Sequence, residues 1–407
     1  MSRTALLLLV VSLAAGAPGF AQFPTGAIDS LRRVPPLLPD VTPCDPTGNV
    51  DEVPFEPTSV PLEDWLKERK ASQISMNLNV SPPELRMDQQ TAVSYQASIS
   101  LKNPKLVAQE RKVVFFVGVD SADGKRLTEP STHAANIPEH IQGSFDVGVN
   151  GCVFFRPGSY SLWVAAYDES TGKHGVQRRN IRVSELKNDP LPLLESQMPP
   201  ARFPDFTPED AEIDKVLPSA LLLPVSNKRP LDIDIVSLSP FQRSGIGPLT
   251  QMALKDSSVS VVTLDLQTQK VVYDSRVTGT FDFIEMLKAA EKYRQDQTID
   301  FNVLLTRDDR EGFLRKFLEA RIKSTDGKAR VTFVLSSPVD FRRGADTSPI
   351  RFDENCDCRL YYLQMFPYGS DDLRKILTST QSRRLEINSA MELRKALATI
   401  MRDLEEF

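Results

Sequence analysis

The chain has 407 residues, with 49 lysines and arginines against 54 aspartates and glutamates, and a formal net charge of −5. That mildly acidic balance argues against a nucleic-acid-binding protein, which needs a basic face to neutralise phosphates. Hydrophobic residues make up 41% and charged residues 25% of the chain, which excludes disorder throughout and predicts about two or three folded domains. Three histidines leave little material for a histidine-rich metal site or a histidine general base.

Residues 1–21 have the pattern of a secretory signal peptide. Arg3 supplies the positive charge, residues 5–15 form an apolar run, and small residues precede a cleavage site after Ala21. An uncleaved membrane anchor is the alternative, but the apolar run is shorter than the roughly 20 residues that cross a bilayer. No later segment is long and apolar enough, so the chain is expected to be periplasmic or extracellular, with no membrane span after signal cleavage.

Export would place the four cysteines in an oxidising compartment, where disulfides form and persist. Four cysteines allow three pairings. The predicted pairing joins Cys44 to Cys152, which ties the N-terminal segment to the first domain, and Cys356 to Cys358, which closes a tight ring. A redox-active or metal-binding Cys-x-Cys motif is the sharper alternative, although no second cysteine pair or neighbouring histidine completes a zinc set.

Residues 22–73 are predicted to form a proline-rich N-terminal arm. Proline lacks the amide donor and biases the preceding residue toward extended geometry, so the repeated prolines favour an extended segment. A short helix is expected within residues 59–70. A proline-rich recognition motif is the alternative to a linker or packing arm.

Residues 74–185 have the pattern of a β-sandwich, because several short strands are divided by turn clusters. The turn Arg156-Pro157-Gly158-Ser159-Tyr160 starts one of these strands. The segment resembles the immunoglobulin-like modules of exported bacterial proteins, in which a Pro-Gly-x-Tyr strand start near the end of the module is common. That resemblance concerns the fold only. The expected strands are 75–80, 92–101, 113–119, 152–155, 160–167 and 176–183.

Residues 186–230 are again rich in proline and are predicted to be an interdomain linker, with a short helix over 208–216. From residue 231 strands alternate with helices, which implies a central sheet covered on both faces. The last helix opens with the capping box Ser389-Ala390-Met391-Glu392. The other expected helices are centred on 283–290, 313–322 and 371–378, and the expected strands are 231–238, 259–264, 270–273, 301–305, 331–335, 359–366 and 384–387.

The region 231–407 resembles the von Willebrand factor A domain in its opening strand with a polar turn, its β-hairpin across 265–269, and its closing strand and helix. It is most similar to the degenerate A-type domains of exported proteins of soil bacteria, in which such a domain follows an immunoglobulin-like one. The resemblance implies a three-layer α/β domain of Rossmann type. The expected fold is therefore an immunoglobulin-like β-sandwich followed by a von Willebrand A-like α/β domain.

The family holds Mg²⁺ through an Asp-x-Ser-x-Ser turn after the first strand and through a later Thr and Asp. Here the position of the first Asp is Ile235, and Asp234 lies one residue early, where a strand points its side chain to the opposite face. The later acidic position reads Ser-Ser-Pro. Because hard divalent cations need anionic oxygen ligands, the metal site is predicted to be lost and no cofactor is expected. The degenerate site positions are Ile235, Ser237, Ser239, Ser336 and Ser337.

Other candidate sites have simpler interpretations. The sequence has no nucleophile elbow, Walker loop or His-Glu-x-x-His motif. His133 and His140 are interpreted as exposed histidines of a loop. The acidic run 308–311 suits a helix N-terminus, where the helix dipole favours carboxylates. The arginine pairs 342–343 and 383–384 are interpreted as a solvated face, with an anion patch as the alternative.

The sequence therefore predicts an exported, non-catalytic binding protein that works without a metal and whose partner is a protein or polymer at the cell envelope. One alternative is an exported enzyme that uses Asp308, Asp309 and Asp353 at strand ends of the α/β sheet. A second alternative is a structural subunit of an exported assembly.

Overall fold

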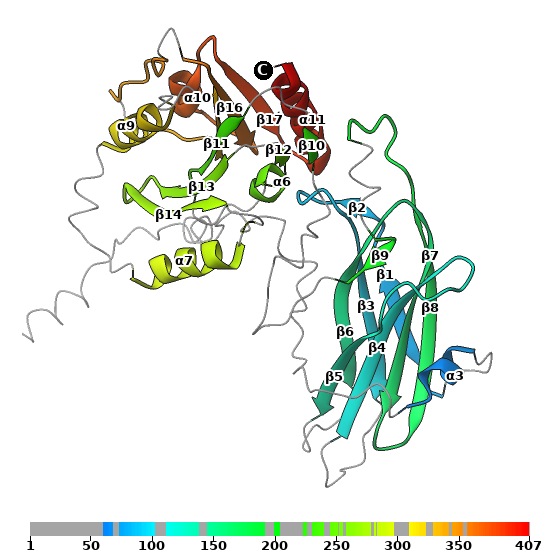
Figure 1. The fold of residues 1–407 in the computed structure, drawn as a ribbon. Coiled ribbons are helices and arrows are strands. Elements are labelled where there is room, and N and C mark those ends of the chain that lie inside the picture. Colours follow the sequence, from blue (N-terminus) through cyan, green and yellow to red (C-terminus); the bar gives the residue numbers. More distant parts are fainter. Residues whose placement is uncertain are drawn as a thin grey trace, which may run out of the picture. The chain divides into compact units, whose positions relative to one another are not determined.

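The computed structural model describes residues 60–67, 73–101, 111–137, 145–191, 199–203, 223–225, 230–239, 245–250, 252–254, 258–277, 281, 283–296, 309–322, 329–341, 344–352 and 356–406. The predicted signal peptide lies outside these residues, as do the predicted helix 208–216 and the predicted strand 301–305. β-strands contribute more residues to the described chain than helices do (Figure 1). Within the described ranges, no helix is long and apolar enough to cross a membrane.

Two antiparallel sheets form the described part of the chain between residues 73 and 203 (Figure 1). The first has the order β1-β3-β6-β9, with β2 beside β3, and contains β1 (Met76–Val80), β2 (Glu84–Leu85), β3 (Thr91–Leu101), β6 (Phe145–Phe155) and β9 (Ala201–Arg202). The second has the order β5-β4-β7-β8 and contains β4 (Arg111–Ser121), β5 (Ser131–Ile137), β7 (Gly158–Asp168) and β8 (Lys173–Val183). Both sheets contribute to one apolar cluster, an arrangement compatible with a β-sandwich.

The second sheet is buried on its outer face as well, because helix α3 (Leu62–Lys67) packs against it. Phe115 belongs to the cluster between the two sheets, whereas Phe116 belongs to a second cluster that includes Trp65 of α3. Trp65 also stacks on the ring of His174, with 4.5 Å between the ring centroids. Burial on both faces explains why β4 is a continuous apolar run rather than an alternating one. The short helix expected within residues 59–70 is therefore confirmed.

The predicted turn before β7 is present and is fixed by a tyrosine. The Tyr160 hydroxyl donates a hydrogen bond to the carbonyl oxygen of Arg156 at 2.9 Å. This bond closes the turn across Pro157 and Gly158 and leaves the ring of Tyr160 in the cluster between the sheets. The five-residue turn pattern therefore predicted the position of the strand, and the structure adds the hydrogen bond by which Tyr160 holds the turn.

The interpretation of His133 as an exposed loop residue is wrong. His133 lies in β5, opposite Phe115 of β4, and is only partly exposed. Small and polar residues make up most of β5, so the strand lacks the alternating apolar pattern by which strands are predicted. His140 lies outside the described residues.

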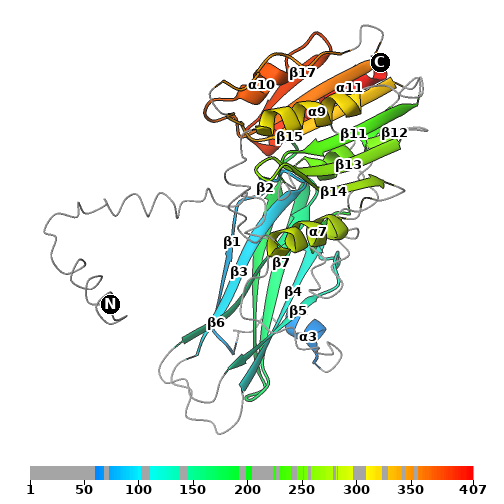
Figure 2. The same cartoon turned by 90° about the vertical axis from the view of Figure 1, so that its left-hand side faces the viewer.

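The later part of the chain contains a six-stranded sheet in the order β14-β13-β11-β15-β16-β17 (Figure 2). All neighbouring strands are parallel except β14, which forms a hairpin with β13. A separate parallel pair joins β10 (Leu223–Val225) to β12 (Met252–Leu254). The six strands are β11 (Leu231–Ser237), β13 (Ser258–Asp265), β14 (Lys270–Val277), β15 (Ala329–Ser336), β16 (Cys358–Met365) and β17 (Ser382–Ile387).

Helices cover both faces of this sheet, as the apolar strands predict. Alternate residues of β11 belong to two clusters: Ile235 packs with α7 (Phe283–Asp296) and α11 (Ala390–Glu406), and Val236 packs with α9 (Arg310–Ile322) and α10 (Asp372–Leu377). The predicted strands and helices that fall on described residues are present, most of them within a few residues of their expected bounds, but β6 begins at Phe145, well before the expected residue 152. The short helix α6 (Ile246–Thr250) was not predicted.

The N-terminus of α11 differs slightly from the predicted capping box. The Glu392 N–H donates to the Ser389 hydroxyl oxygen at 3.3 Å, as expected. The Glu392 carboxylate accepts from the N–H of Asn388 at 2.6 Å, one residue earlier than the capping box requires. Either way an amide at the helix end is satisfied by a side chain.

Residues within the predicted linker 186–230 make specific contacts. β9 pairs with β6, and Asp189 forms an ion pair with Arg394 of α11. The Arg394 guanidinium donates to the two Asp189 oxygens at 2.6 and 2.5 Å and to the Leu191 carbonyl oxygen at 3.2 Å. The Arg394 side chain has no exposed surface, so this segment is held by a buried charge pair.

Candidate binding site at the carboxyl edge of the six-stranded sheet

The parallel strands β11, β15, β16 and β17 end at one edge of the sheet, and ligands of open α/β sheets bind outside this edge. The register places Ser237 beside Leu335, Ser336 beside Gln364, and Gln364 beside Glu386. The structure therefore brings the predicted site residues Ser237 and Ser336 to neighbouring strand ends.

Both serine hydroxyls are engaged with the backbone. The Ser237 hydroxyl donates to the carbonyl oxygen of Ser239 at 2.9 Å, and the Ser336 hydroxyl donates to that of Ser337 at 2.6 Å. Both serines are buried. Each hydroxyl therefore closes the turn that follows its own strand.

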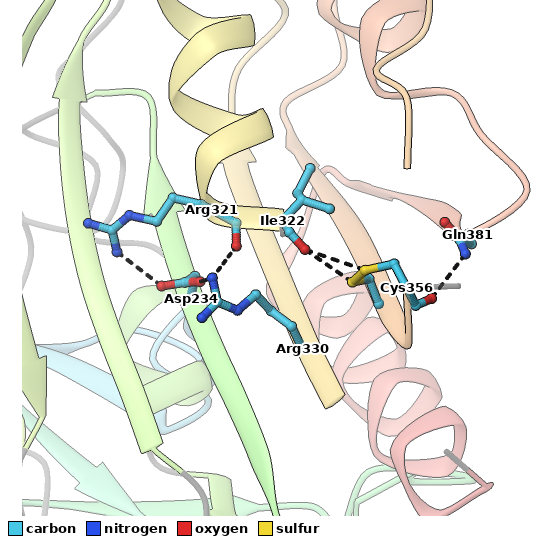
Figure 3. Close-up of a disulfide and its surroundings, with 7 residues drawn as sticks. Asp234, Arg321, Ile322, Arg330, Cys356 and Gln381 are labelled. Atoms are coloured by element: carbon cyan, nitrogen blue, oxygen red, sulfur yellow. Dashed lines mark hydrogen bonds and ion pairs between the residues drawn. A yellow bond between two sulfur atoms is a disulfide. The ribbon is translucent and has the colours of Figure 1, made fainter. Parts of the chain in front are cut away.

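Ile235 and Asp234 decide whether β11 can supply a carboxylate ligand to a metal ion, and they lie on opposite faces of this strand. Ile235 is fully buried in the apolar cluster beneath α11. Asp234 faces α9 instead, where it accepts from Arg321 at 3.0 Å and lies 3.9 Å from Arg330 (Figure 3). Burial raises the pKa of Asp234 above its ordinary value, and the two arginines only partly offset this. Asp234 therefore secures α9 to the sheet, and its carboxylate does not point to the carboxyl edge.

Asp371 is the centre of a hydrogen-bonded network at this edge, and sequence reasoning did not find it. Its carboxylate accepts from the Val339 N–H at 3.1 Å, the Tyr362 hydroxyl at 3.1 Å and the Gln364 amide at 2.9 Å. The Gln364 carbonyl oxygen in turn accepts from Arg384 at 2.7 Å. Burial, together with the negative charge of Asp371, raises the pKa of Tyr362 far above its ordinary value, so Tyr362 remains a proton donor. The only sequence signal was the polar Gln364 within the otherwise apolar run 360–365 of β16.

Two further carboxylates near this edge also have partners. Asp372 accepts from the Phe341 N–H at 3.1 Å and from Lys375 at 2.7 Å. Asp340 accepts from the Ser370 hydroxyl at 2.6 Å. These bonds fasten the loop after β15 to the start of α10.

These residues do not fit the Mg²⁺ that the resemblance implies. The position of the key carboxylate holds a buried apolar side chain, and the neutral hydroxyls of Ser237 and Ser336 are already bonded. Among the described residues, no group of three or more histidine, cysteine, aspartate or glutamate side chains is arranged to hold a metal ion. A small dication prefers anionic oxygen ligands, and none of the described residues 236–239 at the end of β11 carries a carboxylate.

Two surface pockets include residues of β17, one along the strand and one at its amino end. The first, of about 410 Å³, lies beside α10 and is lined by residues that include Arg374, Arg384 and Glu386. The second, of about 490 Å³, lies beside α11 and includes Asp403 and the disulfide. Arg383 lines both pockets.

The structure joins Cys356 to Cys358 in a disulfide near the end of α9 (Figure 3). The sulfur of Cys358 lies 3.0 Å from the carbonyl oxygen of Ile322, the last residue of α9. Because the C-terminal end of a helix is negative, a thiolate at this position would be disfavoured. Cys152 is also disulfide-bonded; its predicted partner Cys44 lies outside the described residues.

The other predicted charged sites are only partly described. Asp309 is exposed beside the start of α9, whereas Asp308 and Asp353 lie outside the described residues. The pair 342–343 also lies outside them. Arg383 forms an ion pair with Asp403 at 2.6 Å, and Arg384 forms one with Glu386 at 2.5 Å. Arg383 and Arg384 are therefore partly exposed to solvent, and each has an acidic partner.

A serine and a histidine meet on β5. The Ser131 hydroxyl and Nε2 of His133 lie 2.9 Å apart. Burial lowers the pKa of His133, so the imidazole is neutral at pH 7. A catalytic pair also needs a group that orients the imidazole, and in the described part of the chain no carboxylate hydrogen-bonds to His133.

No family model matches this chain, and no curated protein matches it. Solved structures with some similarity include AggA, the major subunit of aggregative adherence fimbriae type I from Escherichia coli, which is 10% identical over 29% of this chain and 98% of AggA, with a TM-score of 0.17. The ApaA protein from Bordetella pertussis is 9% identical over 29% of this chain and all of ApaA, with a TM-score of 0.17. Beta-glucuronidase 2 from Bacteroides uniformis is 11% identical over 74% of this chain and 37% of the enzyme, with a TM-score of 0.19. Such low TM-scores carry no conclusion about fold or function.

Proposed function

We propose that this chain is an exported, non-catalytic binding protein that recognises a protein or polymer at the cell envelope without a metal ion. We infer that residues 74–185 are an immunoglobulin-like sandwich and residues 231–407 a degenerate von Willebrand A-like domain. The strand order supports the second inference: numbered along the sheet's own strands it is 3-2-1-4-5-6, a doubly wound order. The Tyr160 hydroxyl bonded to the backbone four residues earlier supports the first, because a tyrosine of this kind is common in such sandwiches.

The main support for the proposal is that these polar groups at the carboxyl edge are hydrogen-bonded within the protein. Asp371 accepts three hydrogen bonds, and the hydroxyls of Ser237 and Ser336 close their own turns. Acid–base or nucleophilic catalysis requires such groups to reach a substrate. Here they brace the loops, which suits a rigid scaffold that presents a binding surface.

The test is a pull-down of the tagged mature chain from envelope extract, with the same tag on an unrelated exported protein as the control. We expect saturable capture of a specific component, equal in the presence of EDTA and of Mg²⁺. Capture that disappears with EDTA and returns with Mg²⁺ contradicts the metal-independent proposal. Capture no greater than that of the control contradicts the binding function itself.

Export is tested separately. Protein recovered from the periplasm or the medium is expected to begin at Gln22, the residue after the predicted cleavage site. Recovery of the chain only in the cytoplasm with residues 1–21 intact contradicts the proposed location.

A further inference from the structure

Strand β17 is the last strand of the six-stranded sheet, and no described strand pairs with its outer side. Two hydrogen bonds show which residues on this side of the sheet face β16. The Leu360 N–H donates to the Gln381 carbonyl oxygen at 3.0 Å, and the Phe366 N–H donates to the Ile387 carbonyl oxygen at 2.7 Å. In a parallel ladder, alternate residues of a strand direct both backbone groups to the same neighbour. Odd-numbered residues of β17 therefore bond to β16, and Arg384 and Glu386 direct their N–H and C=O groups outward.

The pocket along β17 and the pocket at its amino end are placed beside the path of an added strand. Successive side chains of a strand point to opposite faces, so a strand lying along β17 directs alternate side chains toward α10 and toward α11. The pocket of about 410 Å³ lies on the first side and extends along β17 as far as Glu386. The pocket of about 490 Å³ opens at the amino end of β17 and extends along this strand only as far as Arg383. Recognition by strand addition uses outward backbone groups for hydrogen bonds and pockets beside the strand for alternate side chains.

The pocket beside α10 has a positive excess. It is lined by Arg374, Arg383 and Arg384 but by one acidic residue, Glu386. Arg383 and Arg384 have acidic partners, whereas the exposed side chain of Arg374 forms no ion pair within the described ranges. An acidic side chain on the added strand complements this charge.

We propose that β17 binds an extended, acidic peptide segment of a partner protein by strand addition, with an acidic side chain directed toward Arg374 and Arg384. The proposal rests on the proposed binding function and names its site and its class of partner. Charged residues on an edge strand also discourage pairing with identical strands. In β17 this charge pattern favours an acidic strand over a basic one.

The probe is a fluorescein-labelled, end-capped peptide of sequence Thr-Val-Glu-Val-Glu-Val-Thr, and a matched peptide has lysine at both glutamate positions. Fluorescence anisotropy with the full mature chain is expected to give a Kd below about 1 mM for the glutamate peptide and at least about tenfold weaker binding of the lysine peptide. No measurable binding of the glutamate peptide at 1 mM, or equal binding of the two peptides, overturns the proposal.

Variants at the strand edge separate strand addition from general charge attraction. Glu386→Pro removes an outward N–H from an edge position where proline is tolerated, and binding should weaken about tenfold. Glu386→Gln keeps the N–H and removes a negative charge, so it should bind the glutamate peptide more tightly. Equal affinity of the proline and glutamine variants overturns the proposal. If Glu386→Pro does not fold, Arg374→Glu on the exposed face of α10 provides the test. This variant should bind the glutamate peptide more weakly, and undiminished binding overturns the proposal.

The pull-down distinguishes failure of this site from failure of the proposed function. A partner captured equally by the chain and by its folded Glu386→Pro variant overturns the assignment to β17 and leaves the binding function in place. Peptide binding as expected, with no specific capture from extract, supports the β17 site and contradicts the envelope partner.

Discussion

The ion pair between Asp189 and Arg394 gives the sharpest test of the packing. The Arg394 side chain is fully buried and the Asp189 side chain is 9% exposed. The guanidinium donates to both carboxylate oxygens, at 2.6 and 2.5 Å, and to the Leu191 carbonyl oxygen at 3.2 Å. Asp189→Ala would therefore remove two charged acceptors from a fully buried cation.

The expected cost follows from that geometry. Removing one partner of a buried ion pair typically destabilises a protein by about 3–5 kcal/mol, because the remaining charge is left uncompensated. Replacing both partners with apolar residues is often nearly neutral. We therefore expect Asp189→Ala to lower the free energy of unfolding by about 3 kcal/mol or more, and the double variant Asp189→Ala with Arg394→Met to recover most of that loss.

The assay can isolate the region that carries the pair. The two tryptophans, Trp65 and Trp163, lie in the sandwich part, whereas the long helices α7, α9 and α11 lie in the later part. Urea unfolding followed by circular dichroism at 222 nm therefore reports mainly the helices, and tryptophan fluorescence reports the sandwich. The Asp189→Ala shift is expected in the helical signal.

The pH dependence supplies a second check. Partial burial acts to raise the pKa of Asp189, but hydrogen bonds from Arg394 and the Leu191 N–H outweigh it and hold that pKa below its ordinary value. The folded state thus binds the proton less tightly than the unfolded state. The stabilisation is present above about pH 4 and is lost as pH falls through the lowered pKa; Asp189→Asn should remove this dependence.

Two results would refute this reasoning. A loss smaller than about 1 kcal/mol in Asp189→Ala would show that the charge pair is as weak as an exposed one. A double variant as unstable as Asp189→Ala would show that the cost comes from lost packing rather than from an unpaired charge.

Three shorter predictions test the metal, the cysteines and the sandwich core. Millimolar Mg²⁺ or Mn²⁺ should leave the Tm unchanged, whereas a metal bound at a concentration of 100 times its Kd would stabilise the folded state by about 2.7 kcal/mol. A chelator-reversible rise in Tm that disappears when Ser237 and Ser239 are changed to alanine contradicts this expectation. Thiol titration under denaturing, non-reducing conditions should find no free thiol, since no described cysteine is free; two or more free thiols contradict the disulfide pairing. A Cβ at Gly118 would overlap the ring of Trp163, so Gly118→Ala should cost about 1–3 kcal/mol of unfolding free energy in the tryptophan-monitored transition, and an unchanged midpoint would show that the ring moves freely.

Apolar periodicity predicted most of the strands and helices, because burial repeats at the period of the element. Strands buried on one face alternate, as in β1, and strands buried on both faces contain continuous apolar runs, as in residues 113–119 of β4. β5 was missed because its small and polar residues have no such period. The two-residue strand β9 is too short to show one.

The side-chain network at the carboxyl edge was not predictable in the same way. Asp371, Tyr362 and Arg384 meet only because the register of β16 and β17 aligns them around Gln364. Nothing in the spacing of these residues along the chain indicates that alignment. Arg394 is similar, because its place on α11 says nothing of Asp189, which lies 205 residues earlier.

The proposed resemblance to the von Willebrand A domain leads to a final prediction. Ile235→Asp places a carboxylate where that family has its first aspartate, and we expect that it will not create a metal site. Ile235 pairs with Val261 on one side and Phe333 on the other, and it has no exposed surface. It lies two residues before the end of β11, so a carboxylate there is buried among apolar side chains rather than presented at the edge. Loss of the isoleucine alone costs about 2–5 kcal/mol, and burial of an unpaired charge adds to this. Burial raises the pKa of the new carboxyl, so the variant should be less stable at pH 8 than at pH 5, relative to Ile235→Asn. Mg²⁺ should not restore its Tm; a magnesium-dependent recovery would show that the carboxylate reaches the edge and that Ser237 still serves as a ligand.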